Sequence, residues 1–170
     1  MDILGSNDID KITEKIWLGN SFASKDIINL NKLGIKKILS IMDSPPKLKE
    51  NDNFIRKFIK LSDFPRINII KYFGECINFI EGEEKILVHC SIGSSRSSTI
   101  VIAYLMWKEK IKFEEAYNFV KNKRKIVCPN AGFKEQLKIF EDLLIKNNYD
   151  ISQIDFLNVE KKGKYEKSEW

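Results

Sequence analysis

Hydrophobic residues in the first ninety positions fall into short runs and helically spaced stripes. Apolar runs bounded by charge are typical of strands buried on both faces of a parallel sheet, and alternating patterns indicate half-buried strands. These patterns predict strands over residues 16–19, 35–42, 54–61 and 85–89. Apolar residues spaced as on one helical face predict helices over residues 24–33 and 69–80, each followed by a helix-ending glycine.

The rest of the chain is predicted to be mainly helical. Residues 99–108 are so continuously apolar that the helix they predict must be buried nearly all round. Amphipathic spacing predicts two further helices over residues 113–123 and 133–145. Strands that alternate with helices, followed by a helical C-terminal half, predict an α/β fold. Its central, mostly parallel twisted sheet is flanked by helices.

The composition suits one compact domain. The chain has 170 residues, of which 43% are hydrophobic, and this is enough for a sizeable core. No apolar run approaches the roughly 18 residues that span a bilayer, and residues 1–4 carry neither a basic signal-peptide region nor a myristoylation signal. We therefore expect a domain over residues 1–150, a polar appendage over residues 151–170 and an intracellular protein without a membrane partner.

Charge and cysteine usage narrow the chemistry. The 29 Lys and Arg residues exceed the 24 Asp and Glu residues modestly, which suits anionic partners such as phosphorylated substrates. The three cysteines, Cys76, Cys90 and Cys128, show no paired spacing, so a reducing compartment is expected. The single histidine, His89, cannot supply the several ligands of a zinc site, and we expect neither a metal nor a cofactor.

Residues 90–97 place a cysteine, small residues and an arginine between a predicted strand and a buried helix. Such a loop at a helix N-terminus points backbone N–H groups inward and, with the helix dipole, forms an anion site suited to phosphate. The same field favours a nucleophilic thiolate at Cys90. Arg96 can hold two phosphate oxygens, Gly93 permits a close turn, and Ser97 can donate a hydrogen bond to sulfur. The implied chemistry is phosphoryl transfer to sulfur, followed by hydrolysis.

These residues resemble the dual-specificity branch of the cysteine-based protein phosphatases. The likeness extends to Ile-Trp-Leu-Gly-Asn at 16–20, Leu-Gly-Ile at 33–35, Ala-Tyr-Leu-Met at 103–106 and Pro-Asn-x-Gly-Phe-x-x-Gln-Leu at 129–137. The resemblance implies that Cys90 forms a phosphocysteine and that Arg96 binds phosphate and stabilises the transition state. The main-chain N–H groups of the phosphate-binding loop would come from Ser91, Ile92, Gly93, Ser94 and Ser95.

The expulsion of a serine or threonine alkoxide also needs a proton donor. Asp43, Asp52 and Asp63 are three loop aspartates upstream of the cysteine, and the pattern of residues alone leaves all three open. The resemblance favours Asp63, because the family places its acid loop between the strand and the helix that flank this residue. It also implies a shallow pocket for both phosphotyrosine and phosphoserine or phosphothreonine.

Two further residues are expected to support the loop. His89 precedes Cys90 on a strand, so its side chain should point to the opposite face and bond to backbone groups that fix the loop. Asn130 could cap the following helix or, as the resemblance implies, brace the phosphate loop. Cys76 is most simply a core residue, whereas Cys128 is a candidate neighbour of the site, with redox pairing to Cys90 a minor hypothesis.

The expected function is therefore a protein phosphatase that acts as a monomer on phosphorylated proteins in the cytoplasm or the nucleus. The basic run at 121–125 lacks interleaved aromatic residues and is interpreted as a solvated helix end, so no nucleic acid partner is expected. A lipid or RNA phosphate substrate is disfavoured because loop residues 91–95 are uncharged. A non-catalytic phosphate-binding module is disfavoured because the nucleophile, the arginine and the acid are all present.

Overall fold

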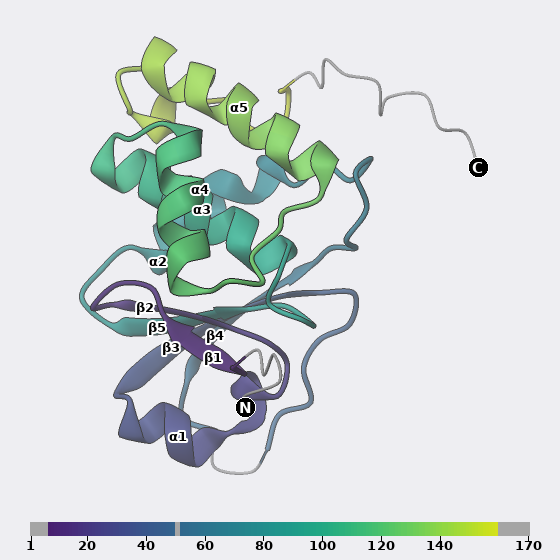
Figure 1. Ribbon diagram of the computed structural model, residues 1–170, viewed down its shortest axis with the longest axis vertical. Helices are drawn as coiled ribbons and strands as arrows, with labels where there is room; N and C mark the ends of the chain where they lie inside the picture. The colour runs from purple at the N-terminus through teal and green to yellow at the C-terminus, as the bar shows by residue number, and fades with distance from the viewer. Residues whose placement is uncertain (1–6, 50–51, 160–170) are drawn as a thin grey trace.

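The computed structural model describes residues 7–49 and 52–159 and contains a five-stranded sheet with helices on both faces (Figure 1). The strands lie in the order β1-β2-β5-β3-β4, and all neighbours pair in parallel except β1 and β2. Their bounds are β1 Ile9–Lys11, β2 Ile16–Gly19, β3 Ile35–Met42, β4 Ile55–Lys60 and β5 Lys85–His89. The predicted α/β fold with a central, mostly parallel sheet is confirmed.

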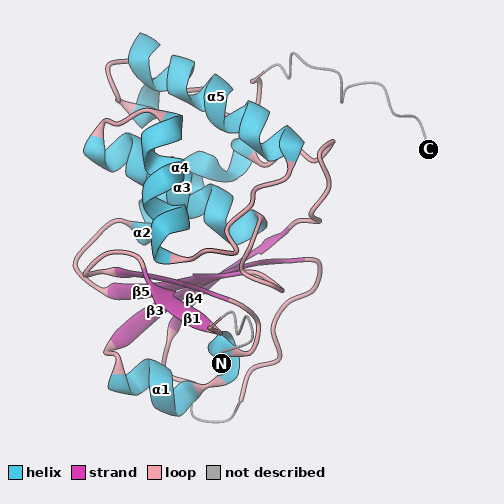
Figure 2. Cartoon of the chain, viewed as in Figure 1, coloured by secondary structure: helices cyan, strands magenta, loops and turns pink. Residues whose placement is uncertain are grey.

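The helices divide unequally between the two faces of the sheet (Figure 2). The short helix α1 (Ile27–Lys32) covers one face. The other face carries α2 (Phe73–Ile80), α3 (Arg96–Glu109), α4 (Phe113–Lys123) and α5 (Ala131–Lys146). Three 3-10 turns complete the fold, at Ala23–Lys25, Ile70–Tyr72 and Ile151–Gln153.

The alternation of side chains along the strands creates a separate core on each face. On β2, Ile16 and Leu18 point into the large core beneath α2 to α5, whereas Trp17 points into a small core beneath α1. On β5, Val88 and Leu87 divide in the same way. The strands are thus buried on both faces, as their continuous apolar runs predict.

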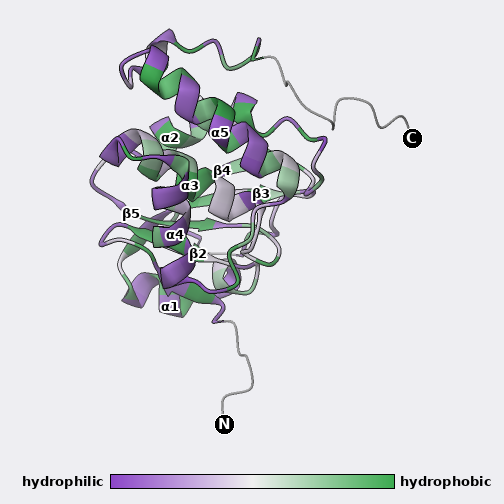
Figure 3. Ribbon diagram, turned by 45° about the horizontal axis from the view of Figure 1, so that its top comes forward, coloured by the Kyte–Doolittle hydropathy of each residue, from purple (hydrophilic) through white to green (hydrophobic). Residues whose placement is uncertain are grey.

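The helix α3 is buried along residues 96–106, because it packs between β5 and the helices α2, α4 and α5. The prediction of a helix buried nearly all round is confirmed. The helix begins at Arg96 rather than at Thr99, since the loop after β5 leads directly into its first turn. By contrast, α5 alternates hydrophilic and hydrophobic residues (Figure 3) and buries one side only.

Several element boundaries differ from the sequence prediction for local reasons. The predicted helix over 24–33 begins only at Ile27, because the side chain of Asp26 caps it by accepting from the backbone N–H of Asn29. The sequence pattern missed β1, which is a short strand at the edge of the sheet with few apolar residues. Such a strand lacks the alternation by which strands are recognised.

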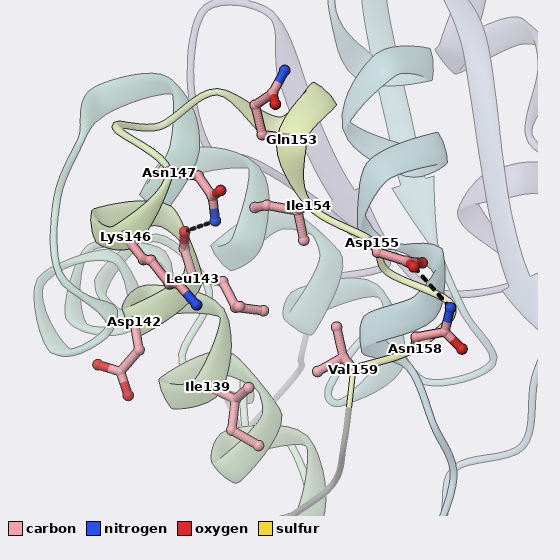
Figure 4. Close-up of a pocket in the computed structure, with 10 residues that line it drawn as sticks. All are labelled: Ile139, Asp142, Leu143, Lys146, Asn147, Gln153, Ile154, Asp155, Asn158 and Val159. Atoms are coloured by element: carbon pink, nitrogen blue, oxygen red, sulfur yellow. Dashed lines mark hydrogen bonds between the residues drawn. The ribbon is translucent and has the colours of Figure 1, made fainter.

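Residues 151–159 follow α5 and pack against it. Ile154 is buried, and the ring of Phe156 lies 6.0 Å from that of Phe140 while covering Gly74. A cavity of about 600 Å³ lies between this segment and α5 (Figure 4). Residues 160–170 of the expected appendage lie outside the described residues, and the domain boundary at residue 150 stays a prediction. Within the described part of the chain, no helix has the length and apolar character needed to cross a membrane.

Candidate active site

The carboxyl ends of parallel strands lie along one side of a sheet, which is called the carboxyl edge here, and ligands of open α/β sheets bind outside it. Here β3 ends one residue before Asp43, and β5 ends one residue before Cys90. Asp63 follows β4 and lies at the carboxyl edge, whereas Asp52 precedes β4 and lies at the opposite edge, where the amino ends of the parallel strands lie. The topology therefore separates one of the three candidate acids from the cysteine.

A cavity of about 290 Å³ opens at this edge. It is lined by Asp63, Cys90, Ile92, Ser94, Ser95, Arg96, Cys128 and Asn130. Most residues of the predicted site thus share one cavity. The larger cavity beside α5 contains no cysteine and lies outside this site. In the described residues, no three His, Cys, Asp or Glu side chains are grouped in a way that could hold a metal ion.

The thiol of Cys90 is buried at the floor of the loop between β5 and α3. Its Sγ accepts a hydrogen bond from the backbone N–H of Gly93 at 3.2 Å and lies 3.1 Å from the hydroxyl of Ser97. The thiol of Cys76 lies instead among the apolar residues of α2, where burial raises its pKa strongly.

The loop closes tightly around Gly93, whose φ of +75° lies in the left-handed region. A Cβ at this position would meet the carbonyl oxygen of Gly19 at 2.5 Å, so β2 and the loop approach as closely as their backbones allow. The conformational freedom assigned to Gly93 is therefore required by both its torsion angle and its surroundings.

Arg96 begins α3 and directs its buried guanidinium across the loop. It donates to the carboxylate of Asp43 at 2.8 Å, the carbonyl of Leu61 at 3.1 Å and the hydroxyl of Ser91 at 3.0 Å. Its Nε is buried and, among the described residues, has no hydrogen-bond partner. A planar donor group held over a loop in this way can still accept an anion at Nε.

Of the three candidate aspartates, Asp43 and Asp52 are held in their ionised form. A hydrogen bond from Ser62 and, against the cost of burial, further bonding from Arg96 keep the pKa of Asp43 below its usual range. Hydrogen bonding from Arg56 likewise lowers the pKa of Asp52. A carboxyl group with a lowered pKa is a poor proton donor at neutral pH.

Asp63 occupies a different environment at the mouth of the loop. Its Oδ1 accepts hydrogen bonds from the hydroxyl of Ser95 at 2.7 Å and from the side-chain amide of Asn130 at 2.8 Å. The carbonyl oxygen of that amide accepts from the backbone N–H of Phe133, so Asn130 caps α5. Its own backbone N–H donates to Ser95 at 3.0 Å. Asn130 thus caps the helix and contacts the loop, which joins the two interpretations left open by the sequence.

His89 ends β5 and is fully buried beneath the loop. Its Nε2 lies 2.6 Å from the hydroxyl of Ser40, and its Nδ1 lies 3.3 Å from the carbonyl oxygen of Cys90. Burial lowers the pKa of His89 to about 4, so the imidazole is neutral at physiological pH. The contact with the Cys90 carbonyl agrees with a residue that fixes loop backbone.

One residue of the basic run 121–125 was interpreted wrongly from the sequence. Arg124 is not on a solvated face: its side chain is 1% exposed and pairs with Asp10 at 2.7 Å. It donates to the carbonyl oxygens of Gly93 at 2.9 Å and Ile92 at 3.2 Å. The burial of Arg124 could not be predicted because its partner Asp10 lies on β1, a strand that the sequence pattern missed. Without that strand, the end of the helix is expected to be exposed.

Comparison with known proteins bears on this geometry. Residues 16–143 match the model of the family described as "Dual specificity phosphatase, catalytic domain". The chain belongs to the dual specificity phosphatase family. The family expected from the sequence is confirmed, and the matched region contains the loop, all three candidate aspartates and Arg124.

Individual members of the family give the same result. "Dual specificity protein phosphatase MPK-4" of Drosophila melanogaster is 37% identical over 142 residues, which is 80% of this chain and 37% of that protein. "Dual specificity protein phosphatase 15" of Mus musculus is 38% identical over 138 residues, or 79% of this chain and 58% of that protein. A crystal structure of DUSP15 superimposes with a TM-score of 0.76 at 32% identity and covers 87% of this chain and 97% of that one. The chain therefore spans only part of the length of the Drosophila and mouse relatives.

Proposed function

We propose that this chain is a protein phosphatase of dual specificity, which hydrolyses phosphotyrosine and phosphoserine or phosphothreonine through a phosphocysteine intermediate. The observation that carries the proposal is the convergence of Cys90, Arg96 and Asp63 in one cavity at the carboxyl edge of the sheet. A nucleophile, an anion-binding cation and a carboxyl group are the three groups that this reaction needs.

In the first step, the Cys90 thiolate attacks phosphorus, and the bond from phosphorus to the substrate oxygen breaks. The buried Nε of Arg96 supports a role in binding the phosphate, because this donor has no hydrogen-bond partner among the residues that the structure describes. The N–H group of Gly93 points inward, since it donates to Sγ of Cys90, and in this proposal the N–H groups of residues 91–95 complete the anion site. These donors would stabilise the charge that develops on the transferring phosphoryl group.

Asp63 is the proposed general acid that protonates the departing oxygen. Asp52 lies at the far edge of the sheet, and Asp43 is engaged by Ser62 and Arg96, which keep it ionised. Asp63 lines the cavity and is held by two donors at the rim of the loop. This placement supports Asp63 as the acid expected from the family resemblance.

In the second step, water attacks the phosphocysteine, and the bond from sulfur to phosphorus breaks to release inorganic phosphate. Ser97 lies 3.1 Å from Sγ and is buried, so its hydroxyl can donate to the sulfur as negative charge returns to it. Asp63, now ionised, can accept the proton of the attacking water.

The proposed substrates are phosphorylated proteins, bound by a monomer in the reducing environment of the cytoplasm or nucleus. The uncharged side chains of residues 91–95 support a protein rather than a polyanionic lipid or RNA substrate. A thiolate nucleophile also requires a reducing compartment, because it is readily oxidised.

The proposal is tested by the hydrolysis of para-nitrophenyl phosphate by the wild type and by Cys90→Ser, in chelator and reductant. We expect activity in the wild type and a loss of about 10⁴-fold or more in the variant, as removal of a nucleophile causes in other enzymes. Cys76→Ser is a matched control, because that thiol lies in the core on α2. Equal activity of Cys90→Ser and the wild type would exclude the thiolate mechanism, and an inactive, reduced wild type would favour a phosphate-binding module.

A further inference from the structure

The carbonyl groups of loop residues 91–95 all accept hydrogen bonds from residues outside that segment. The carbonyl of Ser91 accepts from the backbone N–H of Ser21 at 3.2 Å, and that of Ser94 accepts from the backbone N–H of Cys128 at 2.8 Å. The carbonyl of Ser95 accepts from the backbone N–H of Thr99 in α3 at 3.0 Å. The two remaining carbonyls, at the turn of the loop, both accept from a single side chain, that of Arg124.

The guanidinium of Arg124 lies behind the loop, between it and β1. Its Nε donates to the carbonyl of Gly93 at 2.9 Å, and its Nη2 donates to that of Ile92 at 3.2 Å. On its other edge, Nη1 donates to Asp10 at 2.7 Å and to the carbonyl of Asn7 at 2.6 Å. The side chain is buried and does not line the cavity, so it has no direct route to a substrate.

Peptide geometry connects these contacts to the nucleophile. In a trans peptide unit the C=O and the following N–H point in opposite directions. The outward pull of Arg124 on the carbonyl of Ile92 therefore directs the N–H of Gly93 inward, where it donates to Sγ of Cys90 at 3.2 Å. By the same rule, the contact with the carbonyl of Gly93 directs the N–H of Ser94 into the loop.

We propose that Arg124 is a positioning residue of the phosphatase reaction. By fixing the peptide units 92–93 and 93–94, it aims one N–H at the nucleophilic sulfur and one at the bound phosphate. This inference rests on the proposed function, since it assigns Arg124 a part in that same site.

Only arginine has the geometry for this task. The planar fork offers five N–H donors, and four of its hydrogen bonds reach two loop carbonyls on one side and Asp10 with Asn7 on the other. Lysine would keep the positive charge beside Asp10, but a single ammonium cannot reach all of these acceptors in one plane. The substitution R124K thus separates the fork from the charge.

The test measures three quantities for the wild type and R124K: kcat/KM for para-nitrophenyl phosphate, the inhibition constant of inorganic phosphate, and the pH dependence of Cys90 alkylation by iodoacetamide, followed by peptide mass spectrometry. We expect R124K to lower kcat/KM about 10- to 100-fold, as misplacement of site groups does. The phosphate inhibition constant should rise, and Cys90 alkylation should move to higher pH. R56K is the matched control, because Arg56 pairs with Asp52 at the opposite edge of the sheet, and it should change none of these quantities.

The outcomes distinguish the two proposals. An active wild type with a folded R124K that matches it within twofold in all three quantities overturns the role of Arg124 alone. If the wild type neither hydrolyses para-nitrophenyl phosphate nor binds inorganic phosphate, the proposed function is overturned, and the role of Arg124 with it.

Should R124K fail to fold, the wild type itself provides the decisive measurement. The side-chain Nε–H resonance of Arg124 should shift in ¹⁵N–¹H spectra on titration with inorganic phosphate, because the peptide units it holds would carry the bound anion. An unchanged resonance at saturating phosphate overturns the proposal.

Discussion

The phosphate loop and the segment that carries Asp63 face each other across one cavity, yet they are built differently. The loop is a compact run of consecutive residues that contains the proposed nucleophile Cys90, the tight turn at Gly93 and Arg96. The acid segment, residues 61–69, is held by several distant elements. Among them are α5 and its N-cap, some seventy residues further along the chain. The two parts of the site thus differ in the source of their reacting groups. The loop carries Cys90 and Arg96 within seven consecutive residues, although distant segments hold its carbonyls, whereas Asp63 depends on distant segments for its position.

The contacts of the acid segment make this dependence concrete. Gln136 on α5 donates to the carbonyl of Ile67 at 2.8 Å and accepts from the N–H of Ile70. Gly132 lies so close to Pro65 that a Cβ on it would meet the proline carbonyl oxygen at 1.9 Å. The start of α5 thus packs against the segment that carries Asp63 and fixes its backbone. Residues far from Cys90 in sequence therefore contribute to the geometry of the site.

The largest effect on the acid segment is expected from removal of its carboxyl group, the proposed general acid Asp63. We expect D63A to lower kcat about 100-fold or more on a phosphothreonine peptide, because an alkoxide leaves slowly without a proton. The loss should be much smaller on aryl phosphates with strongly acidic leaving groups, which need no protonation. Steady-state kinetics over a series of leaving groups measures the difference.

The control for this prediction is D52A. Asp52 pairs with Arg56 at the far edge of the sheet, so its removal should leave kcat unchanged on every substrate. A leaving-group dependence in D63A no steeper than in the wild type would remove Asp63 from the mechanism.

The burial of His89 beneath the loop can be tested through the pH dependence of stability. Burial lowers the pKa of His89 to about 4 from its ordinary value of 6.5, so between these values the unfolded chain binds a proton that the folded chain does not. Stability therefore rises with pH across this window, and about 3 kcal/mol of it is lost on acidification from pH 6.5 to 4.

The substitution H89Q removes this titration and keeps a hydrogen-bonding side chain beneath the loop. Denaturant unfolding at several pH values should show a smaller fall in the free energy of unfolding for H89Q than for the wild type. The carboxylates with lowered pKa are common to both proteins and cancel in the difference. Parallel curves for the two proteins would contradict the burial of a neutral imidazole.

The smallest expected effect concerns Asn130, which joins the two halves of the site. N130A loses both the helix cap and the donor to Asp63, so it should lower the free energy of unfolding by about 1 kcal/mol. It should also lower kcat about fivefold, the worth of one hydrogen bond.

The variant N130S separates these two contributions. Serine caps helices well, so stability should return, whereas its short side chain cannot donate to Asp63 and kcat should stay low. Denaturant unfolding and kinetics on a phosphothreonine peptide provide both readouts. Recovery of kcat together with stability would show that the contact with Asp63 has no part in the reaction.

The sequence pattern predicts the strands β2 to β5 and the helices α2 to α5, and it locates the loop that carries Cys90, the proposed nucleophile. These features have local signals: continuous apolar runs mark buried strands, and a cysteine, a glycine and an arginine within one loop indicate an anion site. The family resemblance then added Asp63, which periodicity could not distinguish from Asp43 and Asp52.

The other features of the site depend on the tertiary structure. It placed Asp43 on Arg96, Asp52 at the far edge of the sheet, and Arg124 in a buried position behind the loop. Each of these depends on chain segments that lie far apart in sequence, such as β1 and the end of α4. The hydrogen-bonding needs of buried carbonyls and charges are satisfied only when those segments meet, and no pattern within a single segment records which partner will arrive.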